Sequence, residues 1–360
     1  MNKLRILHIN TDLKFLHAIT HYEDPNIHND LLFIGDAKGD VRVKFQFSNT
    51  KSDLDKIITL ANNYDAVILL DLEQAKSYIA NRLRKDISVF WFFFGYELYG
   101  KILNITLSEL TKRIIQKETF RKGGLLKLGP FSKAYSLWRQ KEFSRAIKRI
   151  DYFLCLCQEE YEFLSHYFKL PEFIQRPYVI ESSLVYNEKL GNKLMIGNSR
   201  SVFNNHIDIL NMLREAPEIE KYAFLNYGPE GQYYDAVMSK GNELGNFKPI
   251  TSFLNKIEFE KVYNVSDAFV MNGYRQMAVG NIITAIRHGV KLYINYKNPF
   301  YHFLIKNGFL VSEINDLDND LRNKHITLNE PEMEQNIRAL VNLSKKYSQN
   351  DFVGRIEDCM

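Results

Sequence analysis

The sequence has no long hydrophobic run: its longest, VFWFFF at Val89–Phe94, has the length of a strand. A helix that crosses a bilayer needs about 20 apolar residues, so no spanning segment is expected. No signal-peptide pattern precedes the apolar stretch in MNKLRILHI, and we expect a protein of the cytoplasm.

Cysteine is scarce too, since Cys155, Cys157 and Cys359 are the three in 360 residues. Three are too few for a disulfide framework, and no second Cys/His pair accompanies Cys155 and Cys157 to complete a zinc site. We therefore expect buried structural thiols.

Neither glycine fingerprint of nucleotide-binding proteins occurs in the chain, which disfavours a P-loop NTPase and a Rossmann dehydrogenase. Three D-x-D pairs are present, but they fall at helix starts or in loops rather than at strand ends: Asp53–Asp55, Asp316–Asp318 and Asp318–Asp320. The sequence predicts neither a metal site nor another cofactor.

Positive charge is concentrated in residues 101–150, which hold thirteen Lys/Arg against three Glu, a net of +10. The whole chain has a net charge of +4, so the remainder carries 4 − 10 = −6. Helices are expected at Leu103–Lys117 and Ser132–Ile150, with Trp138 and aliphatic residues among the cations. This pattern favours contact with an anionic membrane surface. A solvated face over an ordinary core is the alternative, and nucleic acid is disfavoured because no nucleic-acid motif occurs.

Strand-like apolar runs alternate with helical spacing along most of the chain, which predicts an α/β fold of two doubly wound, Rossmann-like domains. The expected strands are Leu4–Ile9, Asp30–Gly35, Val41–Phe47, Tyr64–Leu70, Ser88–Phe94, Tyr152–Cys157, Lys193–Gly197, Lys221–Tyr227, Asp267–Met271 and Lys291–Asn295. A hinge at Glu188–Lys193 divides an N-terminal, acceptor-binding domain (1–188) from a C-terminal, nucleotide-sugar-binding domain (189–345), followed by a tail (346–360). Ligands of such sheets bind beyond the carboxyl ends of the strands, here expected in a central cleft between the domains.

The loop NGYRQMAVG, between the expected strand ending at Met271 and a helix starting near Asn281, is the strongest binding candidate. Arg275 offers a planar fork of donors, Gly280 permits close backbone approach, and the helix N-terminus favours an anion. The combination suits a diphosphate. The alternative is an ordinary loop in which Arg275 is solvated.

Two other loops of the second domain carry weaker signals. Gly197, Asn198 and Ser199 leave its first strand and face phosphate or sugar hydroxyls, with Asn204 or Asn205 capping the helix that holds His206. Tyr227, Gly228 and Tyr233 surround a turn where tyrosine rings stack on a base or sugar. Plain capping, a surface His206 and core tyrosines are the alternatives.

The apolar strand of the first domain ends at Gly95, which places Tyr96 and Glu97 at the expected cleft edge. A carboxylate beside aromatic surface has a raised pKa, as a general base requires. Alternatively, Glu97 only favours the N-terminal dipole of the next helix.

Several of these motifs, in this order, resemble the TDP-N-acetylfucosamine:lipid II transferases of enterobacterial common antigen assembly, which are GT-B glycosyltransferases. The matching pieces are WFFFGYELY, IGNSRSVFNNHIDIL, YGPEGQYYDAV, IEFEKVYNVSDAFVMNGYRQMAVGN and INYKNPFY, from about Val89 to Leu310. The chain departs from the family at Tyr96-Glu97, where the family has Ala-Asp, and at Lys297, where it has Glu.

The resemblance implies transfer of a deoxy- or amino sugar from a TDP-, UDP- or GDP-linked donor to a polyprenyl-diphosphate-linked saccharide. The implied place is the inner face of the cytoplasmic membrane, for a surface glycan. We predict donor contacts at Gly197, Asn198, Ser199, Tyr227, Gly228, Tyr233, Arg275, Gln276, Gly280, Asn281 and Asn298, and acceptor contacts at Gly95, Tyr96 and His206, with Glu97 as the catalytic base. A sugar-nucleotide epimerase and a non-catalytic, membrane-docked nucleotide-sugar binding protein remain alternatives.

Overall fold

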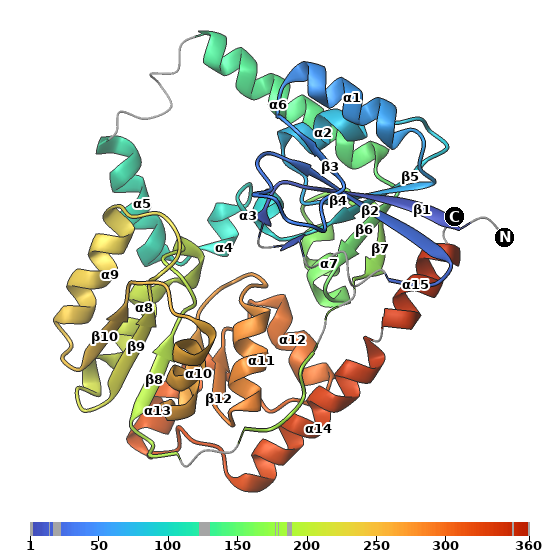
Figure 1. Ribbon diagram of the computed structural model, residues 1–360. Coiled ribbons are helices and arrows are strands. Elements are labelled where there is room, and N and C mark those ends of the chain that lie inside the picture. The colour runs from blue at the N-terminus through green and yellow to red at the C-terminus, as the bar shows by residue number, and fades with distance from the viewer. Residues whose placement is uncertain are drawn as a thin grey trace. The chain divides into compact units, whose positions relative to one another are not determined.

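The chain forms two compact units, each built on its own parallel sheet (Figure 1). The computed structural model describes residues 3–13, 15–16, 23–121, 130–176, 178, 180–185, 189–347 and 349–358. Unit 1 comprises Met1–Gly100, Leu128–Val179 and Lys346–Met360, and unit 2 comprises Lys101–Lys127 and Ile180–Lys345.

Unit 1 holds a seven-stranded sheet in the order β3-β2-β1-β4-β5-β6-β7, with every neighbouring pair parallel. Its strands are β1 (Leu4–Asn10), β2 (Ile27–Ile34), β3 (Phe45–Phe47), β4 (Ala66–Leu70), β5 (Ser88–Phe92), β6 (Tyr152–Cys155) and β7 (Glu172–Gln175). Its helices are α1 (Lys51–Ala61), α2 (Gln74–Ala80), α3 (Tyr96–Tyr99), α6 (Pro130–Arg149), α7 (Gln158–Ser165) and α15 (Gln349–Asp358). All five residues of β4 are buried, as expected for a strand covered on both faces.

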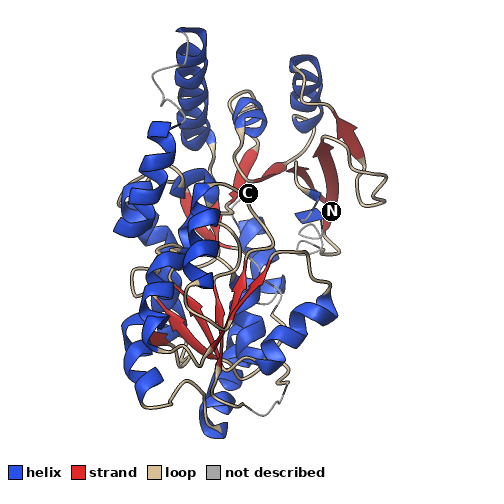
Figure 2. Cartoon of the chain, turned by 90° about the vertical axis from the view of Figure 1, so that its left-hand side faces the viewer, coloured by secondary structure: helices blue, strands red, loops and turns tan. Residues whose placement is uncertain are grey.

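Unit 2 holds a six-stranded parallel sheet in the order β10-β9-β8-β11-β12-β13, and helices flank these strands on both sides in the lower part of Figure 2. Its strands are β8 (Lys193–Ile196), β9 (Glu220–Phe224), β10 (Phe247–Ile250), β11 (Ala268–Met271), β12 (Lys291–Ile294) and β13 (Ser312–Glu313). Its helices are α4 (Leu103–Thr106), α5 (Glu109–Arg121), α8 (His206–Met212), α9 (Gln232–Asn242), α10 (Lys256–Val265), α11 (Val279–Arg287), α12 (Pro299–Lys306), α13 (Leu317–Arg322) and α14 (Glu330–Lys346).

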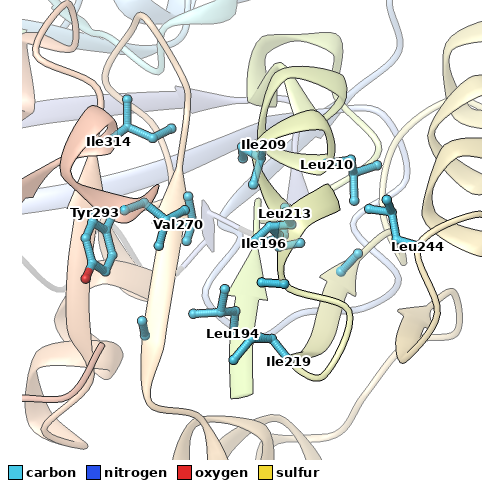
Figure 3. Packing of buried hydrophobic residues seen from close by; sticks show 14 of the residues in the cluster. Leu194, Ile196, Ile209, Leu210, Leu213, Ile219, Leu244, Val270, Tyr293 and Ile314 are labelled. Atoms are coloured by element: carbon cyan, nitrogen blue, oxygen red, sulfur yellow. The ribbon is translucent and has the colours of Figure 1, made fainter. Parts of the chain in front are cut away.

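The core of unit 2 lies between the sheet and the helices that connect its strands. Leu194 and Val270, from adjacent strands, pack in one cluster with Ile209 of α8 and with Leu213, which follows α8, and all four are fully buried (Figure 3). Burial of a side chain of this size contributes roughly 1.5–3 kcal/mol to folding. The predicted α/β class of two doubly wound sheets is therefore confirmed.

The two units do not follow the predicted boundaries, because the first part of the basic segment belongs to unit 2. The Ser108 hydroxyl donates to Asp208 at 2.5 Å, and the Ser108 N–H donates to Asn205 at 2.9 Å. Leu110 and Ile114 of α5 pack against the core cluster of unit 2. These contacts join residues about one hundred positions apart, so the basic segment 101–150 is divided between the units.

The chain end returns to unit 1 instead of forming a separate tail. The Tyr347 hydroxyl donates to the Leu156 carbonyl at 3.1 Å, and Ile356 of α15 is fully buried in the core of unit 1. Cys155 and Cys157 are free and buried, as predicted, whereas Cys359 lies outside the described residues. Among the described residues, no helix has both the length and the hydrophobicity needed to cross a bilayer.

Candidate functional site

The order of the strands locates one candidate site in each unit. In unit 1, successive strands are added to one side of the sheet from β1 to β3 and to the other side from β4 onward, so the strand order switches between β1 and β4. In unit 2 it switches in the same way between β8 and β11. Ligands of open α/β sheets bind at such a switch point, beyond the carboxyl ends of the two strands. The loops that follow these four strands are therefore the candidate binding loops.

In unit 2, the loop after β8 begins at Gly197 in the left-handed conformation, with φ +60°. A Cβ at this position would lie 2.5 Å from Nε2 of His206, so the backbone turn rests directly on the imidazole. His206 is fully buried rather than a surface residue, and its backbone N–H donates to the Tyr233 hydroxyl at 2.8 Å. Burial lowers the pKa of His206 to about 3, so the ring is neutral. His206 therefore packs against the turn from the core side, and Tyr233 holds His206 in place.

Two asparagines shape the rest of this loop, but not as helix caps. Asn204 is fully buried; its side-chain oxygen accepts from the Asn198 N–H at 3.2 Å, and its amide donates to the Ser199 carbonyl at 3.0 Å. Asn205 occupies the N-cap position of α8 in the left-handed region, without a side-chain capping bond. The prediction is thus confirmed for the position of Asn205, but neither side chain caps the helix, because both bond to loops.

A chain of buried amides joins the loops that follow β8, β11 and β12. The Asn205 amide donates to the Asn272 carbonyl at 2.9 Å, and the Asn295 amide donates to the Asn272 side-chain oxygen at 2.8 Å. Asn298 caps α12 by accepting from the Phe300 N–H at 3.0 Å. Buried amides bonded in this way fix the relative positions of three loops at the carboxyl edge.

The Arg275 loop leads into α11, which begins at Val279, two residues before the predicted start. Its N-cap is Ala278, a non-glycine residue with φ +59°, and no side chain caps the helix. Gly280 is exposed in the first turn, and Gln276 is buried. The half-buried Arg275 guanidinium lies 4.5 Å from the centre of the Phe203 ring. Uncapped N–H groups, a strained backbone and a held cation together favour an anion at this point.

Asn281 does not face that anion position through its side chain. Its amide donates to the hydroxyl of the fully buried Tyr263 at 2.8 Å, which ties α11 to α10. Only its backbone N–H, in the first turn of the helix, remains for the predicted donor contact.

The sequence motifs did not indicate Arg200, which holds together the loops after β9 and β10. Its guanidinium donates to the carbonyls of Leu225, Gly228 at 3.4 Å and Thr251 at 3.2 Å. Its backbone N–H donates to the Tyr227 carbonyl at 2.6 Å, while the Tyr227 side chain is 62% exposed. Arg200 therefore fixes the backbone that presents the Tyr227 ring. The carbonyl groups that it binds come from separate parts of the chain and meet only in the folded protein, so the sequence alone does not reveal this role.

In unit 1, Glu97 lies in the first turn of the short helix α3, whose N-cap is Gly95 with φ +112°. One carboxylate oxygen accepts from the Trp91 indole N–H at 3.3 Å and the Phe94 N–H at 3.4 Å, and the other accepts from the Gly95 N–H at 2.8 Å. Burial raises the pKa of Glu97 to about 7. The carboxylate lies in the first turn of α3, where the alternative interpretation placed it, and in addition it holds the turn through these bonds.

The switch point of unit 1 carries a buried ion pair that sequence reasoning missed. Asp71, directly after β4, has φ +69° and pairs with the fully buried Lys76 at 2.7 Å. The Lys76 ammonium also donates to the Thr11 hydroxyl after β1 at 2.8 Å. Burial raises the pKa of Asp71 and lowers that of Lys76. Left-handed strain and a buried charge pair at one place are typical of a functional site.

Tyr96 connects this pair to the loop after β5. Its hydroxyl donates to the Glu73 carboxylate at 2.8 Å, and the Glu73 N–H donates to Asp71 at 3.0 Å. Tyr96 is 48% exposed and therefore accessible to a ligand.

The D-x-D carboxylates have protein partners. Asp53 pairs with Lys56 at 2.9 Å, and Asp320 pairs with Lys291 at 2.7 Å. Among the described residues, no group of three or more His, Cys, Asp or Glu side chains is placed to hold a metal ion.

Comparison with solved structures gives matches along nearly the whole chain. The apo form of the lipopolysaccharide outer core galactosyltransferase WaaB is 13% identical, with a TM-score of 0.64 over 99% of this chain and 100% of that one. HepE of Anabaena, in complex with UDP and glucose, is 11% identical, with a TM-score of 0.62 over 99% of both chains. Sucrose-phosphate synthase of Thermosynechococcus elongatus is 9% identical, with a TM-score of 0.64 over 99% of this chain and 98% of that one. The chain has the GT-B fold.

No protein-family model matches the sequence, and no curated protein matches it significantly. At identities of 9–13% the likeness is one of fold. Within the GT-B fold, the candidate donor residues Gly197, Tyr227, Arg275 and Gly280 all follow strands at the carboxyl edge of the second sheet. Glu97 and Tyr96 follow β5 at the corresponding edge of the first sheet.

Proposed function

We propose that this protein is a glycosyltransferase that moves a deoxy- or amino sugar from a nucleotide-diphosphate donor to a polyprenyl-diphosphate-linked saccharide. The observation that carries the proposal is the uncapped N-terminus of α11, preceded by Arg275, beside the switch point of the second sheet. A diphosphate matches this combination of N–H groups and cation. Two structures of the same fold support it, a galactosyltransferase and a protein in complex with UDP and glucose.

In this proposal the donor diphosphate binds at the first turn of α11. The Arg275 guanidinium and the backbone N–H groups near Gly280 stabilise the negative charge that develops as the nucleoside diphosphate departs. Gly197 lets the turn pack directly on His206, where a Cβ would overlap the ring, and so fixes the backbone that approaches the sugar or phosphate. The exposed Tyr227 ring stacks on the base, which is thymine, uracil or guanine.

Glu97 is the proposed base of unit 1. As the acceptor oxygen bonds to the anomeric carbon and the nucleotide leaves, the hydroxyl proton passes to the carboxylate. A pKa of about 7 suits this task, because the group is partly ionised at neutral pH and still accepts the proton. Glu97→Gln is expected to abolish transfer while nucleotide binding in unit 2 persists.

The first test is a thermal-shift panel of TDP, UDP, GDP, CMP and NAD on the wild type and on Arg275→Ala. One nucleoside diphosphate is expected to stabilise the wild type, by about 2.7 kcal/mol at one hundred times its Kd. Arg275→Ala removes a charged hydrogen-bond donor worth roughly 1.5–3 kcal/mol, so affinity falls about 10- to 150-fold. Arg214→Ala, at an exposed arginine beyond the last turn of α8, is the matched control.

The outcomes separate the alternatives. Stabilisation by NAD alone, or by nothing in the panel, refutes the donor assignment and leaves a likeness of fold. Tight diphosphate binding without nucleotide release for any acceptor identifies a binding protein, and conversion of the free nucleotide sugar identifies an epimerase. Unchanged affinity in Arg275→Ala places the diphosphate elsewhere.

The proposal also places the protein on an anionic membrane, at the inner face of the cytoplasmic membrane, through α6. Leu137 is 66% exposed and Trp138 is 40% exposed, on the helix that also presents Lys141 and Lys148 to solvent. Exposed apolar residues among cations are typical of interfacial helices.

The membrane assignment predicts weaker vesicle binding when these charges are reversed. Each basic residue near an anionic surface contributes about 1 kcal/mol, so a variant with Lys141, Arg145 and Lys148 changed to Glu should detach from phosphatidylserine vesicles in sedimentation assays. Lys248, Lys256 and Lys261, exposed on unit 2, changed to Glu together form the charge-matched control. Equal binding of both variants would rule out α6 as the contact.

A further inference from the structure

A cavity of about 500 Å³ opens on unit 1 among α1, α2 and α6, and none of its lining residues belongs to the donor or base sites described above. Figure 1 shows these three helices as neighbours, and α2 contacts both of the others. Six residues supply the polar and aromatic part of the wall: Asn49, Lys51, Gln74, Tyr78, Arg82 and Trp138. Small-molecule sites have volumes of roughly 300–1,000 Å³, so the cavity is large enough for one or two sugar rings.

The wall along α2 is held in place before any ligand binds. The Tyr78 hydroxyl donates to Asp55 at 2.9 Å, and the Arg82 guanidinium lies 3.6 Å from the centre of the Tyr78 ring. Arg82 also pairs with the buried Glu142 of α6 at 3.0 Å, and Glu142 accepts from the Asn81 amide as well. A ring fixed on two sides loses little freedom when a ligand stacks on it.

The aromatic rings and amides of the lining suit a saccharide. A pyranose has apolar C–H faces, which match the Tyr78 and Trp138 rings, and hydroxyl edges, which match the Asn49 and Gln74 amides as donors and acceptors. No carboxylate is among the lining residues that the structure describes, which disfavours a cation. Leu54 and Ala75 give too little aliphatic surface for a lipid chain.

We propose that this cavity binds the saccharide portion of the acceptor, an inference that rests on the proposed transferase function. Gln74 opens α2 directly after Glu73, whose carboxylate accepts from the Tyr96 hydroxyl at 2.8 Å. Tyr96 in turn precedes Glu97, the proposed base. The cavity thus adjoins, through one helix start, the edge of the first sheet where the acceptor hydroxyl is activated.

Tryptophan fluorescence of the full chain tests the proposal without any transfer reaction. The chain has two tryptophans, Trp91, fully buried, and Trp138, which lines the cavity and is 40% exposed. Titration with N-acetylglucosamine and with N,N′-diacetylchitobiose should give a saturable change in emission that disappears in Trp138→Phe. Equilibrium dialysis of the labelled disaccharide should show at least about 10-fold weaker binding for Trp138→Ala, a loss of about 1.4 kcal/mol.

Leu137→Ala is the matched control, because Leu137 neighbours Trp138 on the same helix, is more exposed and does not line the cavity. Its saccharide affinity should equal that of the wild type. Nucleotide binding in unit 2 is measured for each variant to confirm that the protein is folded.

Three results would overturn the inference: no saturable binding of either saccharide, equal affinity in Trp138→Ala, or displacement of the disaccharide by inorganic phosphate or a nucleoside as effectively as by itself. Saccharide binding without sugar transfer from any donor would uphold the cavity and refute the proposed function. Sugar transfer that is unaffected by Trp138→Ala would uphold the proposed function and refute the assignment of the cavity.

Discussion

Gly197→Ala tests the geometry of the donor loop most directly. Gly197 has φ +60°, and an added Cβ would lie 2.5 Å from Nε2 of the fully buried His206. Gly245→Ala separates the two costs, because Gly245 has φ +66° with nothing within 4 Å of the added Cβ. The left-handed backbone costs roughly 1–2 kcal/mol at either position, offset in part by the lower entropy of the unfolded chain.

The overlap with His206 is specific to Gly197. The imidazole is bonded to Tyr233 and surrounded by core, so the contact is relieved by displacing packed groups, which costs about 1–3 kcal/mol. We expect Gly245→Ala to lower the free energy of unfolding by about 1 kcal/mol and Gly197→Ala by about 2–4 kcal/mol. Gly197→Ala should also weaken nucleoside-diphosphate binding, since the turn is displaced.

Urea unfolding followed by far-UV circular dichroism measures the difference, with hydrogen exchange of β8 and β11 reporting on unit 2 itself. Tryptophan fluorescence does not serve here, because Trp91 and Trp138 both belong to unit 1. Equal losses for the two variants would refute the overlap with His206 and, with it, the described packing of the turn.

Two further predictions concern unit 1. Lys76→Met leaves Asp71 as an unpaired buried charge, so tryptophan-monitored unfolding should show a loss of about 3–5 kcal/mol, whereas Lys56→Met, at an exposed pair, should cost less than about 1 kcal/mol. The pKa of Glu97 is raised from 4.5 to about 7, so the folded state binds this proton more tightly, and the free energy of unfolding falls as pH rises from 4.5 to 7. Glu97→Gln should remove about 3 kcal/mol of that fall, and an unchanged pH profile would contradict the assignment.

The hydrophobic pattern of the sequence was sufficient to predict the alternation of strands and helices, because the central strands are apolar throughout. It failed where a local pattern lacks tertiary support. The alternating VRVKFQF predicts a strand over Val41–Phe47, but Asp40 to Val43 form a turn with Val41 99% exposed, and the strand begins at Phe45. The edge strands β7 and β10 are four residues long, and Pro249 interrupts the apolar run of β10, so neither gave a signal.

The candidate site was predictable only where residue type and chain position coincide, as for Gly197 and Arg275 after strands. Arg200 bonds to the Leu225 carbonyl and Lys76 to the Thr11 hydroxyl, 25 and 65 positions away, and no spacing rule identifies such partners. Likewise, nothing near Ser108 in the chain indicates that its partner is Asp208.

The chain passes between its two units at four places, so neither unit is a continuous stretch of polypeptide. A gene divided at the apparent hinge near residue 189 would give a C-terminal fragment without α5. That fragment would expose the core surface that Leu110 and Ile114 cover, and would leave the Asp208 carboxylate without the Ser108 hydroxyl. Dissecting this protein therefore requires circularly permuted or co-expressed halves that restore the inserted helix, because simple truncation removes part of the unit it aims to isolate.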